Sequence, residues 1–264
     1  MPSTVSAAAA TTAGSCPRDR AVPSAGSSTA HSCAIHQPNL LPRLSTLAKL
    51  FAADVWVVLD DVQFARRDYQ HRARLAGLGA PGRQQWLSLE THLPHGQATL
   101  IRDARLADPH RAARRLRHLP AQYYRDSAYW QRLNAALEPV VDAVPESVGT
   151  AAVAEATTRA LLGLLGWRGT VVHSGDLTVS SNRSARLADL TAAVGADIYL
   201  CGTGGLRYLD RQPFADRRLT VHAFRPPVAD GVWTDAARIS ALWALAAYGP
   251  SCVGAAFEEL RLSD

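Results

Sequence analysis

The chain has 264 residues, of which 47% are hydrophobic and 19% are charged, and its formal net charge is +5. This balance is typical of a globular protein, and no apolar run reaches the roughly 18 residues that a membrane-spanning helix needs, so we expect no membrane partner. Lysine occurs once, at Lys49, and every other basic residue is an arginine, but no nucleic-acid-binding motif accompanies them, so we expect no nucleic-acid partner.

The excess of arginine over lysine has two explanations. A GC-rich coding sequence favours arginine without any functional consequence, whereas the guanidinium group is also well shaped to bind phosphate or carboxylate. The densest basic run, residues 110–118, would present most of its bases to solvent on one face of a helix. Composition alone leaves both explanations open.

The first 31 residues are rich in Ala, Ser and Thr and contain almost no large apolar side chain. Such a segment cannot bury enough surface to fold, so we predict a disordered tail over 1–31 and one domain over 32–264. The tail lacks the apolar central region of a secretory signal. Cysteines at positions 16, 33, 201 and 252 form no Cys-x-x-Cys pair and no zinc-type spacing, so we expect a reducing, cytoplasmic environment and no metal site.

The domain begins with a predicted β-α-β unit. Residues 33–42 predict a short buried strand that ends in polar residues, and 54–64 predict a second buried strand that ends in two carboxylates and an amide. Between them, apolar residues recur at helical spacing over 44–51. Residues 70–76 and 84–89 predict a hairpin whose connection holds Gly77, Gly79, Pro81 and Gly82.

The middle of the chain predicts an extended piece over 99–106 and then three helices, beginning near 108, 127 and 151. An α/β rhythm returns with a strand over 170–173, a helix over 182–194 that Asn182 caps, and a strand over 196–201. An edge strand over 219–224 and an apolar helix over 239–248 follow. The predicted fold is therefore a single Rossmann-like α/β domain with a mostly parallel sheet, a β-hairpin and an inserted helical region.

Polar side chains follow both predicted strands of the first unit. Ligands bind at the carboxyl ends of the strands in open α/β sheets, so we expect these side chains to face one crevice. They are His36, Gln37, Asn39, Asp60, Asp61 and Gln63. His36 is either a general base or a structural histidine bonded to its loop. Adjacent carboxylates usually point to opposite sides, so one of Asp60 and Asp61 would orient or deprotonate a nucleophile, while a solvated loop pair is the alternative.

A glycine-rich segment follows the strand over 196–201. It consists of Gly202, Thr203, Gly204 and Gly205, and its N–H groups would either bind an anion or form an ordinary tight turn. Cys201, just before it, is a candidate nucleophile beside an oxyanion hole; the alternative for Cys201, as for Cys33, is a small buried hydrophobe.

Five further residues complete the predicted substrate-binding set. Two begin the hairpin, one follows the strand over 170–173, and two lie one turn apart at the start of a helix, where they would either reach an anionic group or face solvent. They are His71, Arg72, Ser174, Arg183 and Arg186.

Together these segments resemble the WbqC-like family of bacterial proteins. The residues that carry the resemblance lie in the family's order at 35–42, 54–64, 66–67, 70–72, 86–88, 174–177, 184–187 and 195–210. The chain departs from the usual pattern at three positions. Arg43 stands where an aromatic residue usually follows the proline, Cys201 where serine is common, and Thr203 where proline is common.

Members of this family are found in gene sets for O-antigen and other surface sugars and in natural-product pathways. The resemblance therefore implies a tailoring role, with transfer of an acyl or aminoacyl group from a carrier-protein or coenzyme A thioester to an amine. It implies no required cofactor beyond that phosphopantetheine or coenzyme A donor, a small-molecule substrate and an acyl or peptidyl carrier protein as partner. The oligomeric state is open.

Three other functions stay as alternatives. The strand, His-bearing loop, helix and second strand also resemble pantothenate synthetase and its nucleotidyltransferase relatives, although the His-x-Gly-His signature is missing, which suggests an ATP-dependent ligase or nucleotidyltransferase. A thioester hydrolase would differ from the transferase only in using water as acceptor. A non-catalytic partner of a pathway enzyme would need none of the candidate side chains.

Overall fold

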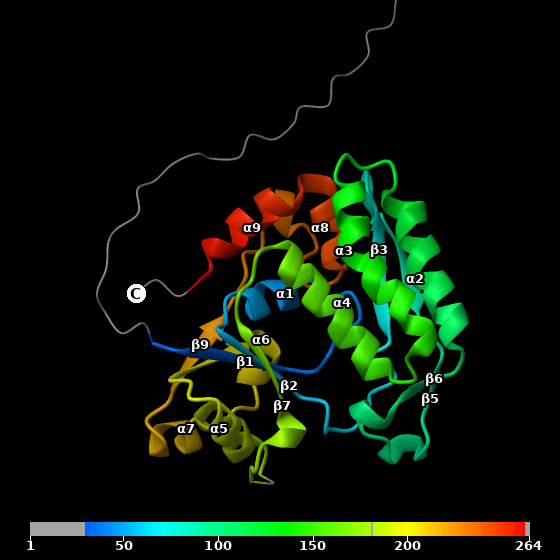
Figure 1. Cartoon of the computed structure of the whole chain (residues 1–264). Helices are drawn as coiled ribbons and strands as arrows, with labels where there is room; N and C mark the ends of the chain where they lie inside the picture. The colour runs from blue at the N-terminus through cyan, green and yellow to red at the C-terminus, as the bar shows by residue number, and fades with distance from the viewer. Residues whose placement is uncertain (1–29, 181, 262–264) are drawn as a thin grey trace, which may run out of the picture.

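The computed structural model describes residues 30–180 and 182–261 of the chain (Figure 1). Apart from its last two residues, the predicted tail over 1–31 lies outside these ranges. The described residues form a central sheet covered by helices on both faces, with a hairpin and further helices to one side. This arrangement confirms the predicted α/β class.

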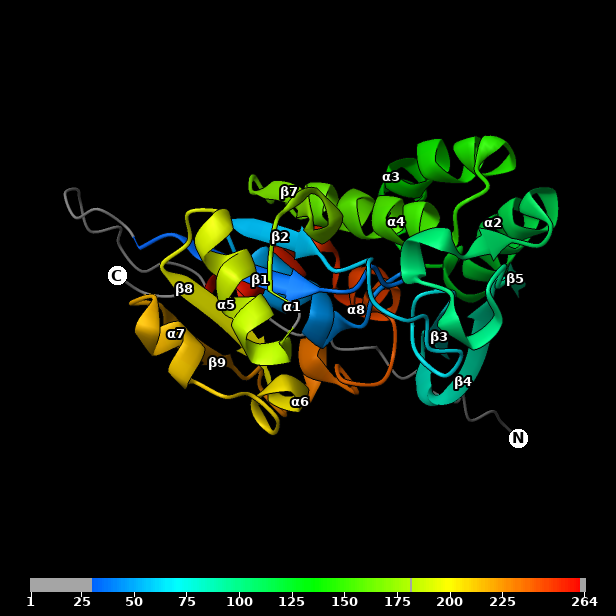
Figure 2. The same cartoon turned by 90° about the horizontal axis from the view of Figure 1, so that it is seen from below.

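The central sheet has five strands, and every neighbouring pair within it is parallel (Figure 2). In sheet order the strands are β7 (Thr170–His173), β2 (Val55–Val58), β1 (Ser32–His36), β8 (Ile198–Gly202) and β9 (Thr220–Phe224). Their apolar runs suit a sheet that is covered on both faces. The predicted parallel sheet and the predicted edge strand are both confirmed.

Helices cover the two faces in separate layers (Figure 1). Successive side chains of a strand point to opposite faces, so Ala34 and Trp56 pack into one core while Cys33 and Ile35 pack into the other. The first core includes α1 (Leu44–Phe51), α4 (Thr150–Leu164), α8 (Ala241–Tyr248) and α9 (Pro250–Glu258). The second includes α5 (Arg183–Ala193) and α7 (Gln212–Asp216).

The rest of the described chain packs mainly beside the first layer. It comprises the hairpin β3 (Arg72–Gly77) and β4 (Ala80–Ser88), the short pair β5 (Thr91–His92) and β6 (Arg105–Leu106), and helices α2 (Pro109–Tyr124) and α3 (Trp130–Ala143). The short helix α6 (Thr203–Leu206) instead follows β8, and its Leu206 packs against the second core. Single 3-10 turns are η1 (Gly96–Ala98), η2 (Ile101–Asp103), η3 (Val144–Glu146), η4 (Ser174–Asp176) and η5 (Gly231–Trp233). In the part of the chain that the structure covers, no helix is both long and apolar enough to cross a membrane.

Three local predictions need correction. Pro81 and Gly82 lie inside β4 and not in the hairpin connection, which is only residues 78–79, because strand pairing continues to Gly77 and Ala80. The piece over 99–106 is extended only in part, since η2 interrupts it. The last predicted helix also ends at Tyr248, whereas in the structure Gly249 turns the chain and Pro250 begins a further helix, α9.

The strand order decides where ligands have access to the sheet. Numbered along the chain, the five strands are arranged 3-2-1-4-5, so the order reverses between β1 and β8. In open parallel sheets such a reversal leaves a crevice outside the carboxyl ends of the two central strands. His36 ends β1 and Gly202 ends β8, so these two residues mark the expected position.

Candidate functional site

A cavity of about 790 Å³ lies at this reversal point. Its walls come from the end of β1, the first turns of α1, the loop after β2, the first turn of α5, segment 202–205 and residues near 224–226. Seven sequence candidates in addition to His36 line it, and most come from the start of α5 and from segment 202–205. They are Gln37, Arg183, Arg186, Gly202, Thr203, Gly204 and Gly205, of which the first lies beside the end of β1. The predicted crevice is thus present, with part of the predicted residue set.

Lys49 reaches this cavity from α1 although its side chain is almost entirely buried. Helical side chains tilt toward the N-terminus of their helix, and here that end lies at the cavity. Its ammonium Nζ lies 3.5 Å from His36 Nδ1. A Cβ atom added at Gly202 would lie 3.9 Å from the same Nζ, so the ammonium sits between the ends of β1 and β8.

Burial and neighbouring charges shift the pKa values of both groups. Burial lowers the pKa of Lys49 to about 8, so the side chain is still mostly an ammonium at pH 7. Burial also lowers the pKa of His36 well below its ordinary value, and the positive charges of Lys49 and Arg43 lower it further. A neutral His36 then accepts a hydrogen bond at Nδ1, because an ammonium can only donate.

The second ring nitrogen of His36 is turned away from solvent. Nε2 is shielded and makes no hydrogen bond with the described residues. The backbone carbonyl of His36 accepts a bond of 3.1 Å from the indole Nε1 of Trp56. Neither ring nitrogen is therefore in a position to take a proton from a ligand, which favours the structural alternative for this histidine.

Positive charge dominates the cavity wall. The guanidinium of Arg43 lies 4.2 Å over the ring of Tyr69 and donates to the carbonyl of Ala237 at 3.2 Å. Arg183 lies 5.6 Å over the ring of Tyr208. With Arg186 and Lys49 these make four basic residues, and within the described ranges no Asp or Glu lines the cavity. The electrostatics suit an anionic ligand.

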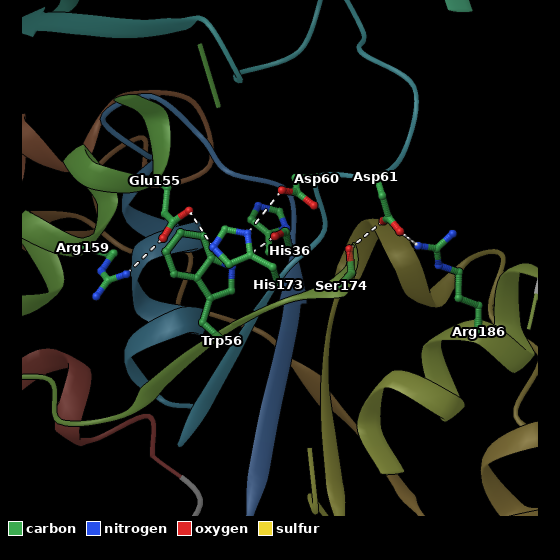
Figure 3. Close-up of polar contacts among 9 residues, drawn as sticks. All are labelled: His36, Trp56, Asp60, Asp61, Glu155, Arg159, His173, Ser174 and Arg186. Atoms are coloured by element: carbon green, nitrogen blue, oxygen red, sulfur yellow. Dashed lines mark hydrogen bonds and ion pairs between the residues drawn. The ribbon is translucent and has the colours of Figure 1, made fainter. Parts of the chain in front are cut away.

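Asp61 holds Arg186 in place at the cavity wall (Figure 3). Its Oδ1 accepts a bond of 2.6 Å from the buried hydroxyl of Ser174, and its Oδ2 pairs with the guanidinium of Arg186. Burial raises the pKa of Asp61, but the bonds from Ser174 and Arg186 outweigh it and lower the pKa below its ordinary value. Asp61 and Ser174 thus act through Arg186 and do not themselves line the cavity.

Asp60 belongs to a separate chain of contacts (Figure 3). Its Oδ2 lies 3.3 Å from Nδ1 of His173, whose Nε2 lies 3.3 Å from Oε2 of Glu155. Arg159 pairs with Glu155 one helical turn further on, at 3.2 Å. The two adjacent aspartates therefore point to different partners, as the strand geometry predicted. Within 30–180 and 182–261, no group of three or more His, Cys, Asp or Glu is arranged to hold a metal ion.

Both candidate nucleophilic cysteines are buried in the core under α5. Burial raises the pKa of Cys33 to about 11 and also raises the pKa of the Cys201 thiol. The thiol of Cys201 lies 3.6 Å from the carbonyl oxygen of Gly202 and does not line the cavity. This environment stabilises the unreactive thiol form and favours the small-hydrophobe alternative for both.

The remaining candidates lie away from the cavity wall. Asn39 is buried, and its carbonyl accepts a bond of 2.8 Å from Thr158. Gln63 donates to the carbonyl of Gln97 at 2.6 Å. The guanidinium of Arg72 lies 4.3 Å over the ring of Trp86.

His71 lines a different hollow, of about 550 Å³, between the hairpin and β5. Burial lowers its pKa to about 4. The structure therefore places Gln63, His71 and Arg72 away from the His36 crevice that the sequence predicted for them, whereas the buried side chain of Asn39 lies beside the imidazole of His36 without lining the cavity.

Comparison with known proteins gives the family. The model of the WbqC-like protein family matches residues 37–229. The chain belongs to the WbqC-like family. It is also 23% identical over 199 residues to the uncharacterized protein Rv1507c of Mycobacterium tuberculosis (strain ATCC 25618 / H37Rv), covering 72% of this chain and 80% of that protein. No solved structure matches the chain significantly.

The region matched by the WbqC-like family contains most of the cavity wall, including several residues that sequence reasoning missed. Lys49 was noted only as the single lysine, and Arg43 only as a departure from the family pattern. Tyr199 lines the cavity from β8. His173 ends a strand as His36 does, so the rule that selected His36 would also have selected it. Glu155 carried no comparable signal, because it lies within an amphipathic helix.

Proposed function

We propose that this WbqC-like protein transfers an acyl or aminoacyl group from a carrier-protein or coenzyme A thioester to an amine, as a tailoring step in a natural-product or surface-sugar pathway. The observation that carries the proposal is the cation-lined cavity at the reversal of strand order. Phosphopantetheine and coenzyme A donors both carry phosphate groups next to a neutral arm. A cavity that is lined by arginines and by several neutral residues suits that distribution of charge.

The wall arginines would bind the donor phosphates. Arg183 and Arg186 extend from the first turn of α5, and Asp61 and Ser174 fix the position of Arg186. Arg43, on the opposite wall, is held by Tyr69 and Ala237. Guanidinium groups that are already oriented lose little freedom on binding, which increases affinity.

The reaction itself needs few protein groups. The neutral amine attacks the carbonyl carbon of the thioester, the carbon–sulfur bond breaks, and the proton lost by the amine passes to the leaving thiolate. The products are an amide and a thiol. Because both nitrogens of His36 are already engaged or shielded, His36 serves to position its neighbours in this scheme and not to remove the proton.

The test is an acceptor-dependent assay with the purified full chain. Acyl-coenzyme A and aminoacylated carrier protein would be incubated with and without an amine, and amide product and intact protein mass would be followed by mass spectrometry. We expect thioester loss only with the amine and no covalent adduct on the protein. Loss of thioester in water alone would show a hydrolase, and an adduct on Cys201 would show a cysteine nucleophile.

Matched variants assign the result to the cavity. Replacing the wall residue in Arg183→Met should raise KM for the donor about tenfold or more, because a phosphate contact is lost. Arg132→Met removes an exposed guanidinium on α3 and should leave KM unchanged. Magnesium-dependent release of pyrophosphate from ATP, without thioester consumption, would replace the proposal by the ligase alternative.

A further inference from the structure

Lys49 is a buried cation without a carboxylate partner in the described part of the chain. Its exposed fraction is 6%, and its polar contact is the neutral ring of His36 at 3.5 Å. Ion pairs between basic and acidic side chains occur elsewhere in the structure, but none of them involves Lys49. Lysine is almost never buried unless it is paired, since moving an isolated ammonium out of water is costly.

We propose that the inner end of the cavity is an anion-binding subsite in which a negatively charged ligand oxygen is the counter-ion of Lys49. The ligand class is an oxyanion, either a phosphate or a carboxylate group. Lys49 supplies the charge and one hydrogen bond, and His36 fixes the direction of the ammonium toward the cavity. This subsite deepens the proposed function, because it places the anionic end of the substrate or the oxygen that becomes charged during acyl transfer.

Three features of the surroundings support the assignment. Lys49 lines the same cavity as Arg43, Arg183 and Arg186, so the electrostatic potential in the cavity favours an anion. Gly202 has no side chain to block access beside the ammonium. The ionisable groups that face Lys49 are His36 and Cys33 on β1, Cys201 on β8 and Arg43 before α1, and none of them is a carboxylate.

The single lysine makes the subsite directly observable. In protein grown with ¹³C-labelled lysine, the side chain of Lys49 gives the only lysine Cε–Hε signal, and its pH titration reports the charge of Nζ. We expect a midpoint near pH 8 in the absence of added anions. A bound anion favours the charged form, so inorganic phosphate, acetate or coenzyme A that enters the subsite should raise the midpoint by about half a unit or more.

The comparison of anions distinguishes the source of the charge. A rise with phosphate and coenzyme A but not with acetate assigns a phosphate group, and a rise with acetate as well assigns any small oxyanion. The Arg183→Met variant should bind the same anions more weakly, whereas Arg132→Met, with its exposed guanidinium, should behave like the wild type. A midpoint that no anion changes up to 50-fold excess over protein would overturn the subsite.

This outcome is independent of the acyl-transfer assay. An anion-dependent midpoint in a protein that consumes no thioester leaves the subsite standing and removes the proposed function. Acyl transfer by a protein whose Lys49 titration midpoint responds to no anion would support the proposed function and overturn the subsite. The titration uses the unmodified chain, so it does not depend on whether a Lys49 variant folds.

Discussion

Asp61 accepts hydrogen bonds from two side chains that come from different elements, Ser174 in η4 and Arg186 in α5. A carboxylate with two donors is stabilised in its charged form, which is why its pKa is low despite partial burial. The same contacts set the position of one wall cation. A change at Asp61 should therefore be visible both in stability and in ligand binding.

Asp61→Asn should lower the free energy of unfolding at pH 7 by about 1 kcal/mol, because it weakens the contacts with Ser174 and Arg186. The loss is modest because solvent screens part of this ion pair. The folded-state pKa is below the unfolded value of about 3.9, so the contribution of Asp61 is present above pH 4 and lost as the pH falls through the folded value. Urea unfolding between pH 7 and pH 3 measures this. The difference from wild type should shrink toward acid, whereas the control Asp126→Asn, at an exposed site, should show little difference at any pH.

At the scale of elements, α5 presents two wall arginines from its first turn. Asn182 caps this helix by accepting from the backbone N–H groups of Ser184 and Ala185, as the sequence predicted. Asp108 caps α2 in the same way through the N–H of Arg111, but α2 does not reach the cavity. Cap variants of the two helices therefore separate the effect of a lost cap on stability from its effect on ligand binding.

Removal of either cap, in Asn182→Ala or Asp108→Ala, should cost about 1 kcal/mol of unfolding free energy. Only Asn182→Ala should also weaken coenzyme A binding, because fraying of α5 moves Arg183 and Arg186. Chemical denaturation and calorimetric binding would be measured on the same samples. Equal affinity in the two variants would show that the first turn of α5 makes no contribution to binding.

Gly249 connects α8 to α9 in a conformation that other residues rarely adopt. Its φ is +83°, and an added Cβ would lie 2.5 Å from the ring of Tyr129. Gly249→Ala should therefore destabilise the fold by about 1–3 kcal/mol. Gly163→Ala, inside α4 with open space around it, should instead be neutral or stabilising by up to about 1 kcal/mol. Denaturation midpoints that move in the same direction for both variants would contradict this reading.

Sequence patterns predicted the elements better than the site, for a physical reason. Parallel strands that are buried on both faces are short apolar runs, and helix caps are local, so both leave a signal within a few residues. The pairing of Lys49 with His36 joins a helix to a strand end through packing, and no local periodicity records it. Lys49 also sits between apolar positions of α1, although lysine side chains ordinarily face solvent.

At the hairpin, closeness along the chain does not correspond to closeness in space. His71 and Arg72 follow closely after the β2 loop, so they were expected to lean over the same crevice. In the structure His71 lines another hollow, and Arg72 packs on the ring of Trp86 in the hairpin. The finer predictions of a Rossmann-like arrangement and an inserted helical region stay predictions.

At the scale of the whole molecule, the core under α5 encloses Cys33 and Cys201 between the sheet and the helix. Access to either thiol requires the layer to open, and burial raises the pKa of both. Iodoacetamide at pH 7.5 should leave both unmodified in the folded protein and modify both in denaturant, as peptide mass mapping would show. Rapid modification of Cys201 in the folded state, with loss of thioester turnover, would restore the cysteine route.

The consecutive residues Asp60 and Asp61 also connect the two layers of helices. Asp61 is tied to α5 on one face of the sheet, and Asp60 is tied through His173 at the edge strand to Glu155 of α4 on the other face. The peptide unit between Asp60 and Asp61 therefore joins contacts to helices that lie on opposite faces of the sheet. A displacement of α5 that carried Asp61 with it would therefore also strain the contacts of Asp60 with His173 and of His173 with Glu155 in α4.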